Sequence, residues 1–204
     1  MDESKIKSFW NYYKALENQL RQTEQYVDHS IENAKMVNGR AFSNEFAKIL
    51  LLTASEFEVI GKNLCLVSGV VGTDNANIAT ISDHLLRIFP NIKQTIISTP
   101  YISFHPLAHW KLVSVNHTMV VEGLPWWKAY NSIKHARGDN FKKANLSNCI
   151  NALASLTVLE LYLSQKALGN MNYISSTPHC YFSFNYGVEE VFWDADRDLP
   201  DFVS

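Results

Sequence analysis

Residues 142–168, "KKANLSNCINALASLTVLELYLSQKAL", decide the fold of this chain. Their middle, residues 150–163, is apolar on nearly every face of a helix, and no proline or glycine occurs before Gly169. A helix that is apolar all round belongs in the interior of a protein, because a surface helix needs one polar face. We therefore predict a long helix over 142–168 that lies at the centre of a helical bundle.

Apolar periodicity predicts further helices around this central one. In residues 3–37 and 43–67, apolar side chains recur every three to four positions, which is the spacing of one helix face. Pro125 is suited to the first turn of a helix, and Gly138 to the end of the same helix. The predicted helices cover residues 3–37, 43–67, 77–89, 124–136 and 142–168. Four to five helices of this kind predict an all-α bundle.

Two segments depart from the helical pattern. Residues 91–122 are rich in β-branched residues and partly alternate, so we expect an inserted loop or a short hairpin there. Residues 170–204 form a tail that is first aromatic and then acidic. The 204 residues therefore divide into one helical domain, residues 1–169, and a C-terminal tail, since this length suits one domain better than two.

The charges are unevenly distributed along the chain. The net charge of −2 indicates no overall attraction to nucleic acid or to a membrane. Residues 128–143, however, contain five lysine or arginine residues and one acid, whereas residues 189–201 contain six acids and one arginine. A molecule polarised in this way can bind an anion at its basic end without being basic overall.

The sequence argues against several classes of protein. Its first residues lack the apolar core of a secretion signal, its apolar runs are too short for a membrane span, and its cysteines form no CxxC pair. We therefore expect a cytoplasmic protein with no membrane partner. There is no P-loop, GxGxxG, GxSxG or HExxH motif, and Pro106 interrupts the pair His105 and His109. We expect neither a metal nor a cofactor.

The candidate functional stretch is residues 125–137, "PWWKAYNSIKHAR". Asn131 and His135 are four residues apart and so share one face of a helix, with Arg137 at the helix end. Cations at a helix C-terminus complement its dipole, so a purely structural role is one interpretation. The other interpretation is an anion site built from His135, Arg137 and the nearby lysines.

Two tryptophans in the same stretch also have two interpretations. Trp126 and Trp127 point about 100° apart on a helix, so we expect one of them to be buried in the core. The other would pack under the inserted segment or stack on a ligand.

Two further groups of polar residues leave alternatives open. Three asparagines at the start of the last helix either tie neighbouring segments together or line a polar site, where backbone N–H groups attract phosphate. These are Asn145, Asn148 and Asn151. Glu56 and Lys62 on the second helix either belong to a solvated stripe or face the His135 region.

Residues 130–137, "YNSIKHAR", together with the long apolar helix that follows them, resemble the HEPN superfamily. Its members are small helical bundles, often ribonucleases of toxin–antitoxin, phage-defence and CRISPR systems. Their motif is an arginine, often followed by a polar residue, and then a histidine ahead of the last long helix. Asn131 matches the polar position and His135 the histidine, whereas Tyr130 or Lys128 occupies the arginine position, depending on the spacing. The resemblance covers approximately the helical domain.

The resemblance implies a metal-independent endoribonuclease of a bacterial or phage defence system, in which two chains pair their motifs in a homodimer. Such cleavage needs a base for the 2′-hydroxyl, an acid for the leaving 5′-oxygen and cations for the phosphoryl charge. His135 would be the acid/base group, Asn131 would position the substrate and Arg137 would contact phosphate. The remaining substrate-binding candidates are Lys128, Tyr130, Lys134 and Trp127.

A non-catalytic protein is the alternative. Tyr130 at the arginine position favours a HEPN-like module that binds a nucleotide, RNA or a protein partner. The 170–204 tail would then be its interaction surface, or a cover over the basic segment. A purely structural bundle is the third possibility.

Overall fold

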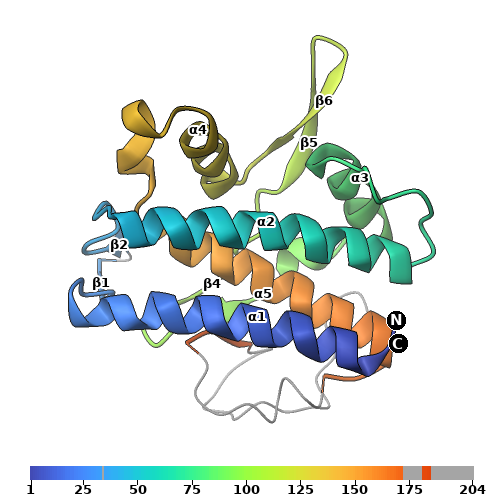
Figure 1. Cartoon of the computed structure of the whole chain (residues 1–204), viewed down its shortest axis with the longest axis horizontal. Helices are drawn as coiled ribbons and strands as arrows, with labels where there is room; N and C mark the ends of the chain where they lie inside the picture. The colour runs from blue at the N-terminus through green and yellow to red at the C-terminus, as the bar shows by residue number, and fades with distance from the viewer. Residues whose placement is uncertain (34, 172–180, 185–204) are drawn as a thin grey trace.

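The computed structural model describes residues 1–33, 35–171 and 181–184, and α-helices make up most of this part of the chain (Figure 1). The helices are α1 (Glu3–Gln22), α2 (Asn44–Val67), α3 (Ile78–Ile88), α4 (Pro125–Asn140) and α5 (Leu146–Leu168). The prediction of a mostly helical protein is confirmed. Short antiparallel sheets also occur among the described residues, so the all-α prediction is not confirmed. Most of the predicted 170–204 tail lies outside the described residues.

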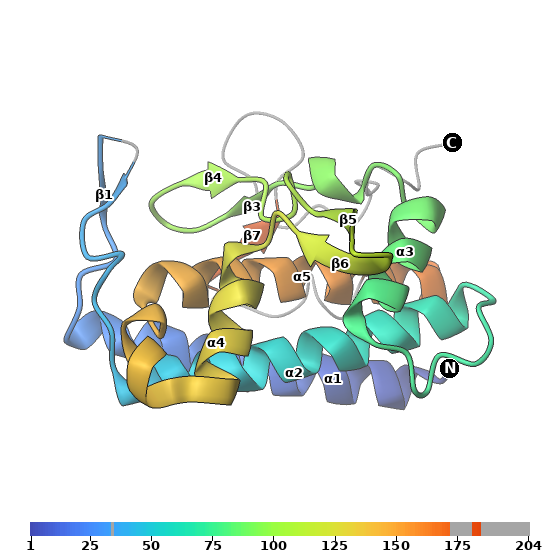
Figure 2. The same ribbon diagram turned by 90° about the horizontal axis from the view of Figure 1, so that it is seen from above.

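Helix α5 is the central helix of the structure. It packs against α1, α2 and α4, and every residue from Ala152 to Ser164 is buried. Figures 1 and 2 show α1, α2 and α5 lying alongside one another. By length and composition α5 could cross a membrane, but 83% of its most apolar window is buried inside the protein. The predicted central position of this helix is confirmed, but its predicted start at residue 142 is wrong, because residues 141–143 form a 3₁₀ turn and the helix begins at Leu146.

Both ends of α5 are set by local chemistry. The side chain of Asn145 caps the first turn, because its Oδ1 accepts a hydrogen bond from the backbone N–H of Asn148 at 3.0 Å. Gly169 ends the helix in the left-handed conformation, with φ of 73°, which a residue with a β-carbon adopts only with strain.

The predicted helix over residues 3–37 is wrong after Gln22. The chain continues as a 3₁₀ turn, Thr23–Gln25, and then as a small hairpin made of β1 (Ile31–Glu32) and β2 (Lys35–Met36). Local side-chain bonds compete with the helix here: the Oγ1 of Thr23 donates to the Leu20 carbonyl, and the Asp28 carboxylate accepts from the N–H and the hydroxyl of Ser30. The absence of proline and glycine alone did not reveal this.

The insert over residues 91–122 forms two hairpins, so the hairpin alternative is correct. The first hairpin pairs β3 (Ile97–Ser98) with β4 (Ser103–Phe104), and β7 (Ser183–Phe184) pairs with the other edge of β3. The second pairs β5 (Lys111–Val115) with β6 (Thr118–Glu122) and projects from the helices (Figure 1). Its turn, Asn116 and His117, has positive φ at both residues, as a two-residue hairpin turn requires.

Candidate basic site on helix α4

Helix α4 divides into a buried face and an exposed basic face. Its buried residues are Trp126, Trp127, Ala129, Tyr130 and Ile133. The helix breaks at Ala136, where φ is −148° and ψ is 66°, and then resumes to Asn140. It therefore does not end at 136, as the sequence indicated, and a 3₁₀ turn, Phe141–Lys143, follows it.

The exposed face of α4 and the turn after it gather positive charge. Its members, which we call the basic face, are Lys128, Lys134, His135, Arg137, Lys142 and Lys143, and all are exposed. Asp139 is the single acid between residues 128 and 143. None of the six forms an ion pair with another described residue. Their charge is therefore free to attract an anionic ligand.

Three of these cations are held in place by neighbouring groups. The Nζ of Lys143 donates to the hydroxyl of Ser132 at 2.9 Å, which ties the 3₁₀ turn back onto α4. The ammonium of Lys134 lies 5.4 Å from the ring centre of Tyr130, and the guanidinium of Arg137 lies 5.9 Å from that of Phe141. These cation–π contacts restrain the two side chains without neutralising their charge.

The residues that resemble the HEPN motif lie at different depths. His135 is exposed and Asn131 is half-buried on the same helix. Neither forms a side-chain hydrogen bond with another residue in the part of the chain that is described. Tyr130, at the arginine position of the motif, is only 6% exposed. His135 is therefore exposed to solvent, and no acid or base among the described residues is hydrogen-bonded to it.

Both tryptophans of the stretch are buried, so the prediction that only one faces the core is wrong. Trp126 is fully buried and Trp127 is 5% exposed. The ring centres of Trp126 and Trp127 lie 5.1 and 6.4 Å from that of Phe57 on α2. Long side chains that leave a helix in different directions can still converge on one neighbouring ring. Trp127 and Tyr130, proposed as substrate contacts, therefore offer a ligand little surface.

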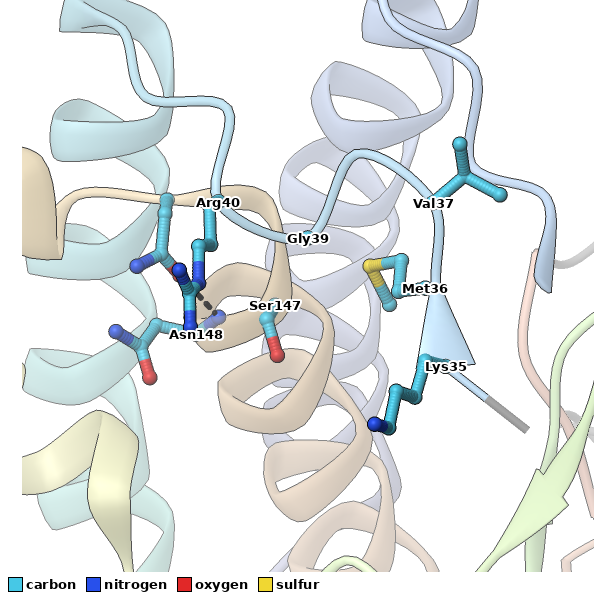
Figure 3. A pocket seen from close by; sticks show the side chains of 8 residues that line it. Lys35, Met36, Val37, Gly39, Arg40, Ser147 and Asn148 are labelled. Carbon is cyan, nitrogen blue, oxygen red and sulfur yellow. Dashed lines mark hydrogen bonds between the residues drawn. The ribbon is translucent and has the colours of Figure 1, made fainter. Parts of the chain in front are cut away.

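A cavity of about 680 Å³ lies between the β1–β2 hairpin, the segment after it and the start of α5 (Figure 3). Its lining residues are Lys35, Met36, Val37, Gly39, Arg40, Asn145, Ser147 and Asn148. In Figure 3 the Arg40 side chain lies beside Asn148, and Lys35 extends from the hairpin toward the same helix. The cavity is a second place where cations of this chain meet solvent.

The first turn of α5 is not available for phosphate. The backbone N–H groups of Leu146 and Ser147 donate to the carbonyls of Ala41 and Gly39, and that of Asn148 donates to Asn145. The amide groups of the asparagines are also bonded, because the Nδ2 atoms of Asn145, Asn148 and Asn151 donate to the carbonyls of Lys142, Lys143 and Ser147. The structure therefore supports the interpretation in which these asparagines hydrogen-bond to neighbouring backbone segments and do not line a phosphate site.

Glu56 and Lys62 do not join the His135 region. The Nζ of Lys62 donates to the carbonyl of Asp74, beyond the other end of α2. The pKa values of Tyr12 on α1 and Glu160 on α5 are raised first by burial and then by the charge of Glu56, so Glu56 lies within electrostatic range of both groups. The prediction that either residue faces His135 is not supported.

Two buried acids were not anticipated from the sequence. Glu160 is fully buried on α5, neither carboxyl oxygen has a hydrogen-bond partner among the described residues, and burial and the charge of Glu56 raise its pKa well above the usual value. Glu17 on α1 is also buried, but it accepts hydrogen bonds from the Tyr13 hydroxyl and the Phe182 N–H. The burial of Glu160 could have been predicted from the sequence, because it is the single charged residue in the apolar run 150–163.

No family model, curated protein or solved structure matches this chain. The described residues contain no group of three or more histidine, cysteine, aspartate or glutamate side chains suited to a metal ion. The class of the protein therefore rests on the fold and on the basic face: a mostly helical protein with an exposed, unpaired cluster of cations. Lysine and arginine side chains of this kind can bind phosphate groups.

Proposed function

We propose that this chain is a HEPN-like helical module that binds the phosphate groups of RNA or of a nucleotide through the basic face. One observation carries the proposal: α4 and the turn after it carry five exposed lysine and arginine side chains as well as exposed His135, and no described acid is paired with any of them. Lysine and arginine neutralise phosphates and release counterions, which supplies most of the affinity of sequence-independent binding. The chain's small net charge does not prevent this, because these cations lie on one helix and the turn that follows it.

The geometry favours backbone recognition over base recognition. Proteins that read single-stranded bases stack them on exposed aromatic rings. On α4 the aromatic rings face the core, and Tyr130 and Trp127 are nearly inaccessible. Binding should therefore depend weakly on sequence and strongly on salt concentration.

The double variant Arg137→Ala/Lys142→Ala tests this proposal. We expect weaker binding to labelled single-stranded RNA and a shallower plot of log affinity against log salt, with a slope change of about 0.7 for each phosphate that the variant no longer neutralises. Fluorescence anisotropy over a range of salt concentrations measures both quantities. Lys7→Ala is the matched control, because Lys7 is an exposed lysine on α1 that is ion-paired to Glu3 at 2.6 Å. Equal affinities and slopes for all three proteins would contradict the proposal.

Metal-independent RNA cleavage is the second candidate function, and the helix break at Ala136 favours it. The break leaves exposed His135 and Arg137 on either side of an irregular turn, where a phosphate could meet both. A single histidine cannot serve as both acid and base in one step, so the reaction would need the motif of a second chain. This candidate therefore requires a homodimer whose interface approaches His135.

His135→Ala tests the catalytic candidate. Cleavage of mixed RNA in the presence of a chelator should be lost, while the free energy of unfolding should change by less than about 0.5 kcal/mol because the side chain is exposed. A gel assay, thermal melting and light scattering of the parent chain give the three readouts. A monomeric parent at micromolar concentration that cleaves no RNA would exclude cleavage and leave the binding function standing.

A further inference from the structure

The cavity shown in Figure 3 shares no residue with the basic face and is a candidate ligand site of its own. One wall is formed by the β1–β2 hairpin and the segment that leads to α2, and the other wall by the start of α5. Its volume of about 680 Å³ lies within the range of about 300–1,000 Å³ that is usual for small-molecule sites. The space is therefore large enough for a small organic ligand.

Backbone hydrogen bonds hold the two walls of this cavity together. The N–H groups of Ser147 and Leu146 donate to the carbonyls of Gly39 and Ala41, both at 3.0 Å. A β-carbon at Gly39 would lie 3.2 Å from that of Met36 and 3.5 Å from that of Ser147, so the absence of a side chain lets this segment lie close to α5. The walls are therefore fixed before a ligand arrives, which lowers the cost of binding.

The charged residues that line the cavity are both cations. Lys35 and Arg40 are exposed, and neither forms an ion pair with another described residue. Glu32 lies opposite Lys35 in the hairpin register, but no ion pair joins their side chains. The carboxylate of Asp28 accepts from the N–H and the hydroxyl of Ser30. The cavity therefore presents two positive charges, which favour an anionic ligand.

A hydrogen-bond donor in the same cavity also lacks a partner. The half-buried Ser147 carries a hydroxyl that bonds to no other residue in the described part of the chain. The neighbouring asparagines differ, because the Nδ2 atoms of Asn145 and Asn148 donate to backbone carbonyls. Figure 3 shows Ser147 on the α5 wall, with Arg40 on one side of it and Lys35 on the other. This set of donors suits a phosphate group, since arginine can bind two oxygens and lysine and a hydroxyl can each bind another.

The rest of the hairpin wall is apolar. Val37 is 51% exposed, and Met36 is half-buried and packs against the core. Both side chains line the cavity. Inorganic phosphate would leave them in water, whereas an ester with an apolar group would cover them. A methionine side chain also makes favourable contacts with aromatic rings, so a flat ring fits this wall.

We propose that this cavity binds a phosphate monoester that carries a flat apolar group, as a mononucleotide does. Arg40 and Lys35 bind the phosphate oxygens, and the Ser147 hydroxyl donates a further hydrogen bond to them. The flat group packs on Met36 and Val37. The site goes beyond the function proposed for the basic face, because it uses none of the residues of that face.

An NMR titration of the full chain with AMP tests the proposal, with inorganic phosphate and adenosine as the two halves of the ligand. We expect AMP to shift the backbone amide signals of Gly39, Arg40 and Ser147 until they saturate, and to bind more tightly than either half. Such shifts support the site whether or not signals on α4 also move. Shifts confined to α4 would place the nucleotide on the basic face, which would support the function proposed there and overturn this site.

Variants of the polar residues complete the experiment. Arg40→Ala should weaken AMP binding at least about tenfold, because it removes a charge-assisted hydrogen bond. Arg40→Lys keeps the charge without the planar fork and should recover part of the affinity. Ser147→Ala should weaken binding by about two- to tenfold, as the loss of a neutral donor does. Thermal melting of each variant verifies that the fold is intact.

Arg87→Ala is the matched control. Arg87 is an exposed arginine on α3 that is paired with Asp83 and lies outside the cavity lining. This variant should bind AMP as tightly as the parent chain. AMP that shifts no cavity signal, that binds the parent and Arg40→Ala equally, or that binds no more tightly than inorganic phosphate would overturn the proposal.

Discussion

Replacing Glu160 by glutamine is expected to stabilise the protein, by an amount that increases with pH. Glu160 is fully buried on α5, and neither of its oxygens has a partner among the described residues. A buried, unpaired carboxyl group resists ionisation, and the nearby charge of Glu56 adds to this, so the pKa of Glu160 is raised well above 4.5. Because the folded state must keep this carboxyl group protonated, the free energy of unfolding is lower at pH values where the unfolded state would release the proton.

The sign of the pH dependence follows from linkage. The folded state keeps the Glu160 proton at pH values where the unfolded state has released it, so the folded state binds more protons and loses stability as the pH rises. The loss is about 1.4 kcal/mol per pH unit, between the unfolded pKa and the raised folded pKa. Glutamine has no such titration, so the two proteins should be similarly stable near pH 4 and should diverge above it.

Denaturant unfolding of the parent and Glu160→Gln between pH 4 and pH 8 measures this effect. Glu17→Gln is the matched control: Glu17 is also buried on a core helix, but its carboxyl group accepts two hydrogen bonds. Burial also raises the pKa of Glu17, but its hydrogen bonds favour the ionised form and oppose that shift, so we expect this control to gain less stability than Glu160→Gln as the pH rises. A Glu160→Gln protein that is less stable than the parent at pH 8 would show that Glu160 has a stabilising partner.

Trp127→Ala should cost about 3–5 kcal/mol of the free energy of unfolding, the usual range for a buried tryptophan. The Trp127 ring is 5% exposed, and its centre lies 5.0 Å from that of Tyr130 and 5.6 Å from that of Trp126. The centre of the Trp127 ring lies 6.4 Å from that of Phe57 on α2, so its removal leaves a cavity between α4 and α2. The helix that carries the basic face would be less firmly attached to the bundle.

Comparison with a neighbouring surface residue separates packing from ligand stacking. Lys134→Ala, on the exposed side of the same helix, should change stability by less than about 0.5 kcal/mol. Trp127→Phe keeps a ring in the site and should recover part of the stability. If Trp127→Ala melted with the parent but bound RNA poorly, the ring would be a ligand contact, and the packing explanation would be wrong.

Helices could be predicted where a segment has both an apolar period and a capping residue of its own. Residues 43–67 and 77–89 were predicted as helices, and α2 (Asn44–Val67) and α3 (Ile78–Ile88) agree within one residue at each end. In both helices a side chain caps the first turn: Ser43 accepts from Phe46 N–H, and Asn77 accepts from Thr80 N–H. The apolar period and the cap are local properties, so they can be read without knowing the neighbours.

The exposed part of the candidate site was predicted and the buried part was not. The sequence placed Lys128, Lys134 and His135 on one helix, as in α4, because charge and spacing are visible in the chain. It placed Lys142 and Lys143 at the start of the next helix, whereas they lie in the 3₁₀ turn before α5. It did not reveal that both tryptophans contact Phe57, or that the helix continues beyond a break at Ala136. Those features depend on α2 and on the 3₁₀ turn, whose Lys143 is bonded to Ser132.

By itself, the sequence determined the central position of α5, the boundaries of α2 and α3, and the concentration of positive charge from Lys128 to Lys143. Only the tertiary structure decided which polar groups meet: Glu160 with the charge of Glu56, and His29 with Tyr181, which is 152 positions away. The physical reason is one of range. Helix formation depends on hydrogen bonds and side-chain spacing within a few residues, whereas burial, shifted pKa values and the pairing of distant groups depend on which elements pack together.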